Sequence, residues 1–164
     1  MLNIVLKPSD RAARYLQRDN IELIRLETVL NFISRYVDKR KKIENVAIVF
    51  DIDCRKVDSE FHFKSRHIII AAISKNNKKT KTRAGRLKYL IECLVHEFRH
   101  CLQELVFKKD ANDVTYGSTD EPEYRKNPLE VDAYWFEEKY SKKALNLYTY
   151  LKKCKLKDVD VYHE

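Results

Sequence analysis

The order of periodic segments along the 164-residue chain predicts a single domain, residues 1–164, with an α+β fold in which a small sheet packs on a long helix. Three observations support this prediction. Residues 83–108 carry apolar side chains at helical spacing, residues 45–52 and 61–73 are apolar and β-branched, and a second helical segment begins near residue 128.

The N-terminal part is expected to contribute a strand and a helix. Residues 4–6 form a short apolar run that predicts a strand. Ser9 is a suitable N-cap, and apolar positions predict one long helix over residues 9–42. Residues 45–52 then predict a strand, and residues 61–73 predict another that leads toward the helix at 83–108.

The helix over residues 83–108 is expected to have two different faces. His96 and His100 lie opposite its apolar stripe, together with Tyr89, Cys93 and Phe107, so another part of the chain is expected to cover them. The stripe consists of Leu87, Leu90, Ile91, Leu94, Phe98, Cys101, Leu102 and Leu105.

Residues 96–100 read His-Glu-Phe-Arg-His. Two histidines four positions apart on a helix point to the same side and can hold one Zn²⁺, while the intervening Glu97 can act as a general base on water. The alternative is a pair of exposed histidines without a function.

A catalytic zinc site needs a third protein ligand and an open position for water. Asn127 is a suitable N-cap and Pro128 suits a first helical turn, so a second helix is expected to present Glu130. Glu130 also stands three residues after Asn127, where it can close a capping box instead of binding metal. Asp132 and Glu137 are the alternative ligands.

The motif His96-Glu97-x-x-His100, followed by Glu130-x-x-Ala133 on a second helix, resembles the gluzincin group of zinc metallopeptidases. The resemblance spans residues 96–133 and is closest to minimal single-domain members. It implies a zincin-like fold in which His96, His100 and Glu130 hold Zn²⁺.

The resemblance also implies that the strand before the metal helix, here residues 61–73, forms the rim of a cleft where an extended peptide pairs. One position departs from the larger pattern. Tyr134 stands where an aspartate usually orients a histidine ligand, so the partner of His96 is left unassigned. Tyr134, Tyr116 and Tyr124 are candidates for a second donor to an oxyanion.

The chain is basic, with a formal net charge of +8. Residues 75–88 contain seven Lys or Arg and no acid, a run that can attract an acidic partner or nucleic acid or can simply be a solvated loop. The chain shows no secretory signal and no run of about 20 apolar residues, so a soluble, cytoplasmic protein without membrane contact is expected. Its four scattered cysteines are expected to be reduced thiols.

These features predict a zinc metallopeptidase that hydrolyses peptide or protein substrates, with Glu97 as the general base. The alternative is a non-catalytic or regulatory metal-binding module that acts through residues 75–88 on nucleic acid or a protein partner.

Overall fold

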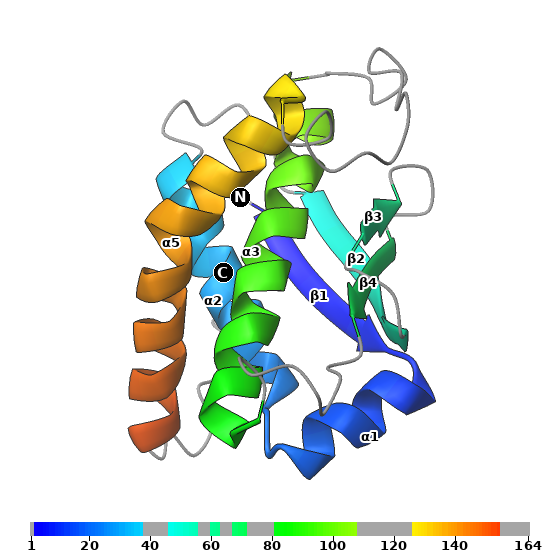
Figure 1. Ribbon diagram of the computed structural model, residues 1–164, viewed down its shortest axis with the longest axis vertical. Helices are drawn as coiled ribbons and strands as arrows, with labels where there is room; N and C mark the ends of the chain where they lie inside the picture. Colours follow the sequence, from blue (N-terminus) through cyan, green and yellow to red (C-terminus); the bar gives the residue numbers. More distant parts are fainter. Residues whose placement is uncertain are drawn as a thin grey trace.

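The computed structural model describes residues 2–37, 46–55, 60–62, 67–71, 81–107 and 126–154. The helices that begin at residues 23, 83 and 128 lie beside one another next to a set of strands, and the helix at residues 10–18 lies below the strands (Figure 1). The elements in chain order are β1 (Leu2–Pro8), α1 (Asp10–Arg18), α2 (Leu23–Val37), β2 (Val46–Arg55), β3 (Glu60–His62), β4 (His67–Ala71), α3 (Arg83–Phe107) and α5 (Pro128–Lys153).

The backbone of the strands forms a sheet in the order β1-β2-β4-β3. β1 and β2 are parallel, with Leu2 opposite Val46, and β4 continues parallel to β2. β3 runs antiparallel to β4 and is the edge strand. α3 contacts β3 and β4, whereas α2 packs on β1 at the other edge of the sheet.

Helices nevertheless dominate the part of the chain whose side chains are described. Of these residues 82% are helical, and they include one short strand and no sheet. The predicted α+β class is therefore wrong for this part, which is mostly helical. The reason lies in the core, because among its described residues only Ile4 and Leu6 come from a strand, whereas the others, apart from Ile21, come from facing sides of helices.

The predicted single helix over residues 9–42 is also wrong. Ser9 does cap α1, since its hydroxyl accepts a hydrogen bond from Ala12 N at 3.2 Å, but α1 ends at Arg18. Asn20 follows with φ 52°, a left-handed conformation that asparagine tolerates better than most residues. The chain therefore turns before α2 begins at Leu23.

The predicted strand over residues 61–73 is instead two strands. β3 and β4 pair antiparallel, and β4 lies between β3 and β2. Because His67–Ile69 pair on both sides, this part of β4 has no open backbone edge to which an extended peptide could add. The expected substrate rim is therefore wrong for β4.

The two long helices predicted after the strands are confirmed. Asn127 caps α5, and its side-chain oxygen accepts a hydrogen bond from Leu129 N at 2.9 Å. α3 and α5 pack against each other (Figure 1). Ala133 is fully buried, and its small side chain lets the two helices come close. Among the described residues, no helix combines the length and the apolar character needed to cross a membrane.

A buried carboxylate fixes the start of α3 to the turn between α1 and α2. The guanidinium of Arg86 donates to both oxygens of Asp19, at 2.8 and 2.7 Å, and Arg18 donates at 3.1 Å. Burial raises the pKa of the Asp19 carboxyl, but the hydrogen bonds and charges of the two arginines outweigh it, so the pKa is lowered from its ordinary value of 3.8.

Asp19→Asn should lower the free energy of unfolding at neutral pH by about 2–3 kcal/mol, less than for a fully buried pair because Arg86 is partly exposed. Since the folded-state pKa lies below 3.8, this stabilisation is complete above that pH and disappears as the pH falls through the lowered pKa. Urea unfolding at pH 7 and about pH 2.5 measures both effects. The exposed Glu138→Gln is the control, and an Asp19→Asn curve that matches wild type at pH 7 would contradict the assignment.

Candidate metal centre

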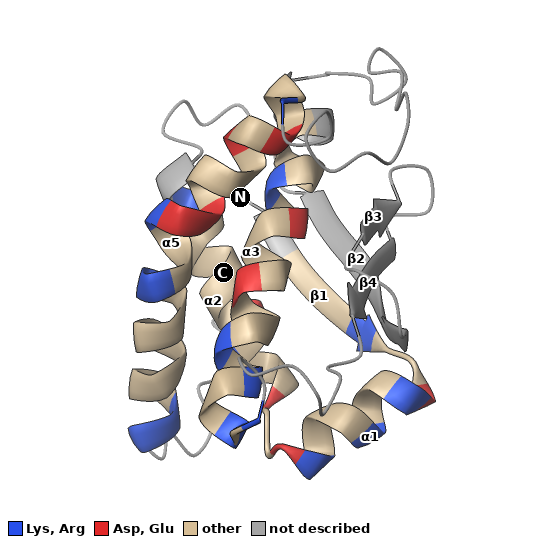
Figure 2. Ribbon diagram, in the orientation of Figure 1, with Lys and Arg blue, Asp and Glu red and all other residues tan. Residues whose placement is uncertain are grey.

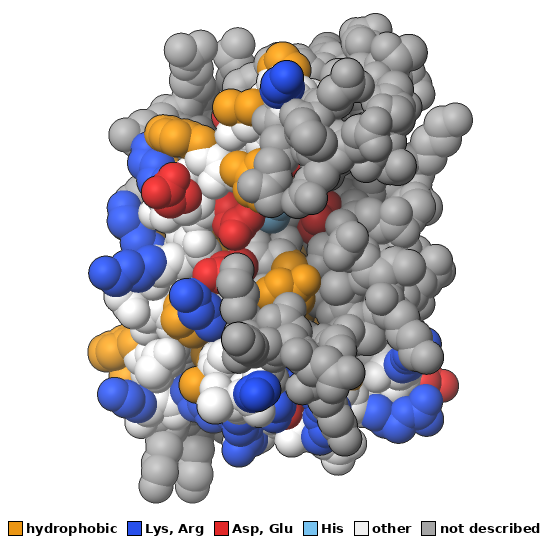
Figure 3. All heavy atoms as spheres, in the orientation of Figure 1, with side chains coloured by type: hydrophobic (Ala, Val, Ile, Leu, Met, Phe, Trp, Pro, Cys, Tyr) orange, Lys and Arg blue, Asp and Glu red, His pale blue; other side chains and the backbone are white. Residues whose placement is uncertain are grey.

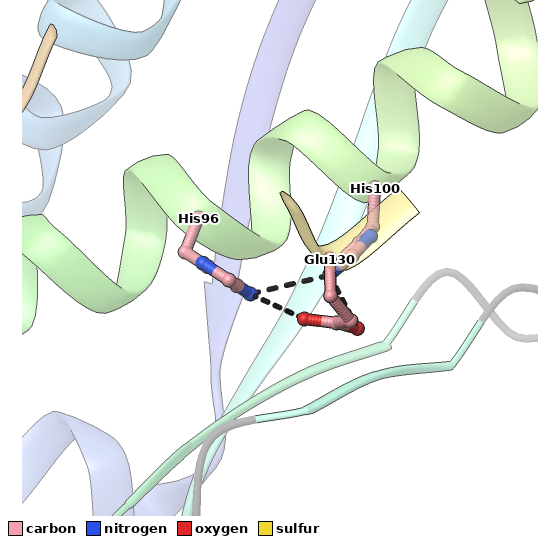
Figure 4. A group of neighbouring side chains, drawn as sticks. All are labelled: His96, His100 and Glu130. Carbon is pink, nitrogen blue, oxygen red and sulfur yellow. Dashed lines mark hydrogen bonds and ion pairs between the residues drawn. The ribbon is translucent and has the colours of Figure 1, made fainter. Parts of the chain in front are cut away.

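Three buried side chains converge between α3 and α5. His96 and His100 project from successive turns of α3, and Glu130 comes from the first turn of α5 (Figure 4). Their exposed fractions are 8%, 5% and 1%. The separation of four residues puts both imidazoles on one side of α3, as the sequence predicted.

The two imidazoles and the carboxylate approach one another closely. His96 Nε2 lies 3.2 Å from Glu130 Oε2, His100 Nε2 lies 3.2 Å from Glu130 Oε1, and the two Nε2 atoms are 3.2 Å apart. Atoms that bind zinc at about 2.0–2.1 Å in a tetrahedron are roughly 3.3 Å from each other. The observed spacing therefore fits a small ion with three protein ligands.

Hydrogen bonds at the other ring nitrogens indicate where the imidazole protons lie. His96 Nδ1 is 3.1 Å from Glu137 Oε2, and His100 Nδ1 is 2.9 Å from Gln103 Oε1. Both partners are acceptors, so each Nδ1 carries a hydrogen. In the neutral rings, both Nε2 atoms then present lone pairs to the centre.

When both rings are neutral, two lone pairs and a carboxylate thus meet with no hydrogen between them. Such a group needs either a proton or a cation between its atoms. Burial lowers the pKa of the His96 imidazole, but hydrogen bonds to two carboxylates and the charge of Glu97 raise it more, to about 9. This electrostatic preference for positive charge is also what a metal ion satisfies, and the group can hold one.

The chemistry of the donor atoms favours one kind of metal. Two imidazoles with one carboxylate suit zinc and other first-row transition metals, whereas Ca²⁺ and Mg²⁺ prefer oxygen ligands. Among the described residues, the group of ligand atoms within 4.8 Å of one another contains His96, His100 and Glu130. Neither Cys93 nor Glu97 belongs to it.

Glu130 has the two roles that the sequence left open, and the geometry favours one of them. Its two carboxylate oxygens each lie 3.2 Å from an imidazole. The cap of α5 is supplied by Asn127, which accepts from Leu129 N. The Glu130 carboxylate is therefore directed toward the histidines while the neighbouring asparagine closes the helix end.

The alternative ligands occupy other positions around the group. Glu137 contacts His96 from the outer side of the ring, and it fills the role that was unassigned because Tyr134 replaces the usual aspartate. Asp132 accepts two hydrogen bonds from Arg99, at 2.7 and 3.1 Å. Sequence reasoning missed Gln103, although its position one turn after His100 on the same helix was a usable signal.

Glu97 and Tyr134 border the group. Glu97 is buried, and its charge acts on His96 strongly enough to raise the pKa of that imidazole. The ring of Tyr134, which is 41% exposed, lies edge-on to His96 with a centroid distance of 4.7 Å. The other tyrosine candidates, Tyr116 and Tyr124, are outside the described residues.

The centre opens at the molecular surface. Figure 3 shows a histidine side chain in a hollow of this face with acidic side chains on either side. Acidic residues also mark the middle of α3 and the first turns of α5, whereas Lys and Arg gather toward the other ends of these helices (Figure 2). In a chain of net charge +8, this local excess of acid favours a cation at the centre.

The predicted basic segment, residues 75–88, lies partly outside the described residues. Within its described part, Arg86 binds Asp19, and Arg83 donates to the backbone carbonyl of the same residue. Lys88 lies 3.6 Å from Glu92 on the next turn. These three basic side chains therefore have intramolecular partners.

A mostly helical fold with a buried group of two histidines and one glutamate defines, at the coarsest level, a candidate metal-binding protein. Comparison with protein-family models, with curated proteins and with solved structures found no match.

Purified protein loaded with zinc should retain about one Zn²⁺ per chain, and His96→Ala or His100→Ala should weaken binding by more than about 100-fold, because three ligands become two. Competition with a chromogenic chelator measures this change. Cys93→Ala, one turn before His96, is the control and should bind as wild type does. Full affinity in both histidine variants would contradict the site.

Glu130→Gln separates the two roles of Glu130. Asn127 still caps α5 in this variant, so the helix should keep its start while zinc affinity falls at least about 10-fold. Asn127→Ala should do the reverse, lowering the free energy of unfolding by about 1 kcal/mol with little effect on zinc. Chelator competition and thermal unfolding of both variants distinguish the roles; unchanged zinc affinity in Glu130→Gln would assign Glu130 to the cap.

Proposed function

We propose that this protein is a zinc-dependent hydrolase of peptide bonds, with His96, His100 and Glu130 as ligands and Glu97 as the general base. The observation that supports it is the convergence of two imidazoles and a carboxylate, with contacts of 3.2 Å, beside a second buried carboxylate, Glu97, that is outside the ligand group. A structural metal site needs no such additional base, whereas hydrolysis does.

Zinc is the proposed metal because of the donor set. Three protein ligands of the N, N, O type leave one tetrahedral position for a water or substrate, which is typical of catalytic rather than structural zinc. When bound, zinc supplies a Lewis acid that polarises a carbonyl oxygen and lowers the pKa of water.

Glu97 is proposed to move the proton during the reaction. Its carboxylate takes a proton from the attacking water as the water oxygen bonds to the carbonyl carbon, and it then gives this proton to the amide nitrogen as the C–N bond breaks. Burial supports this role, since a carboxylate that is 4% exposed is largely shielded from bulk water.

Tyr134 is proposed as the second donor to the oxyanion. Its ring contacts His96, and its position one turn after Glu130 places it at the border of the ligand group. A phenol O–H can donate to an oxygen that becomes negative in the transition state. Its partial exposure is compatible with contact to a substrate.

Glu97→Gln should abolish cleavage while leaving zinc binding intact, with a loss on the order of 10²- to 10⁴-fold in rate because the general base is removed. The assay is a proteome-derived peptide library read by mass spectrometry, with chelator treatment and zinc re-addition. Glu92→Gln, on the same helix and paired with Lys88, is the matched control and should keep wild-type cleavage.

Cleavage by zinc-loaded Glu97→Gln at the wild-type rate would refute the assigned base. Cleavage that survives chelation in the wild-type protein would refute the dependence on metal.

A further inference from the structure

We propose that Gln103 is the positioning residue of the metal centre, because a single side chain holds the His100 ligand and binds Leu129 and Asp132, which flank the Glu130 ligand. Gln103 lies one turn after His100 on α3 and is 1% exposed. This inference rests on the metal site proposed above and assigns the residue that sets its geometry.

The orientation of the Gln103 amide is fixed by its surroundings. Its Nε2 donates to Leu129 O at 2.9 Å and to Asp132 Oδ2 at 2.7 Å, which uses both amide hydrogens. Rotating the amide by half a turn would place its oxygen against a carbonyl and a carboxylate. The oxygen must therefore face His100, 2.9 Å from Nδ1.

This orientation determines which nitrogen of His100 can bind metal. An acceptor at Nδ1 keeps the ring hydrogen there, and the lone pair of the neutral ring is then on Nε2. That atom is the one 3.2 Å from both His96 Nε2 and Glu130 Oε1. Gln103 thus selects the tautomer of His100 that completes the ligand group.

The same amide positions the second helix. Leu129 and Asp132 stand on either side of Glu130 in the first turn of α5, and both are bound by Gln103 from α3. A shift of α5 along α3 would break these bonds as it moved Glu130 relative to the imidazoles. This buried amide therefore helps to set the distance between ligands on different helices.

Arg99 fixes the position of Asp132, which accepts a hydrogen bond from Gln103. Its guanidinium donates to both oxygens of Asp132, at 2.7 and 3.1 Å, and lies 5.1 Å from the centroid of the Phe136 ring. Asp132 is thereby kept in place to accept from Gln103. The chain Arg99–Asp132–Gln103–His100 runs from α3 to α5 and back to α3.

Two measurements test the proposal, and one of them needs neither metal nor substrate. In metal-free wild-type protein, imidazole ¹⁵N shifts of neutral His100 should show hydrogen on Nδ1. In Gln103→Leu, which keeps the volume but removes the amide, this preference should be lost. Gln17→Leu, an exposed position on α1, is the matched control and should keep it.

The second measurement is zinc affinity by chelator competition. Gln103→Leu should bind zinc about 10- to 100-fold more weakly than wild type, and its circular dichroism spectrum should show that the fold is retained.

Gln103→Glu keeps the acceptor for His100 but removes the two amide donors and places a second carboxylate against Asp132, so this variant should also bind zinc more weakly. Adding Asp132→Asn to Gln103→Glu supplies a donor and should recover part of the loss, because the contact is rebuilt with its polarity reversed.

An Nε2–H tautomer of His100 in wild type, or wild-type zinc affinity in Gln103→Leu, would overturn the proposal. Failure of the proposed function looks different, because the tautomer result would hold while wild-type protein bound no zinc or cleaved no peptide.

Discussion

The Nε2 atoms of His96 and His100 lie 3.2 Å apart in the interior between α3 and α5, and each lies 3.2 Å from an oxygen of the Glu130 carboxylate. When the rings are neutral these atoms repel one another, so the surrounding residues must hold them in place. Each atom is an electron-pair donor, so the arrangement is stable only with positive charge at its centre. Glu97 and Glu137 add negative charge beside His96 and so further favour positive charge at the centre. A metal ion can satisfy such a group, and the proposed hydrolysis would use the additional carboxylate as its base.

Helix packing keeps this group assembled. Ala133 allows α3 and α5 to approach, and Gln103 fixes their relative position at the level of Glu130. At the other end of α3, Arg86 donates two hydrogen bonds to the Asp19 carboxylate, and this contact connects the helix to the turn before α2. The centre thus depends on contacts between helices that are distant in the sequence, both in the apolar core and through buried polar groups.

Local patterns in the sequence predicted the local parts of this structure. The spacing of His96 and His100 placed both on one side of a helix, and Asn127 correctly marked the start of α5. The predicted α+β class failed because facing helix sides, which no local pattern reveals, build most of the described core. The turn at Asn20 between α1 and α2 contains no glycine or proline, so the usual sequence signal that a helix ends is missing there. Glu137 and Gln103 acquired their roles only through distances across the α3–α5 interface.

We propose that His96, His100 and Glu130 bind one metal ion and leave one coordination position of the metal free of protein ligands. A crystal structure of zinc-soaked protein, with anomalous diffraction recorded on both sides of the zinc absorption edge, tests it most directly. We expect one anomalous peak about 2.0–2.2 Å from His96 Nε2, His100 Nε2 and one oxygen of Glu130, with a non-protein ligand in the fourth position. A peak elsewhere, or a fourth protein ligand closing the site, would contradict it.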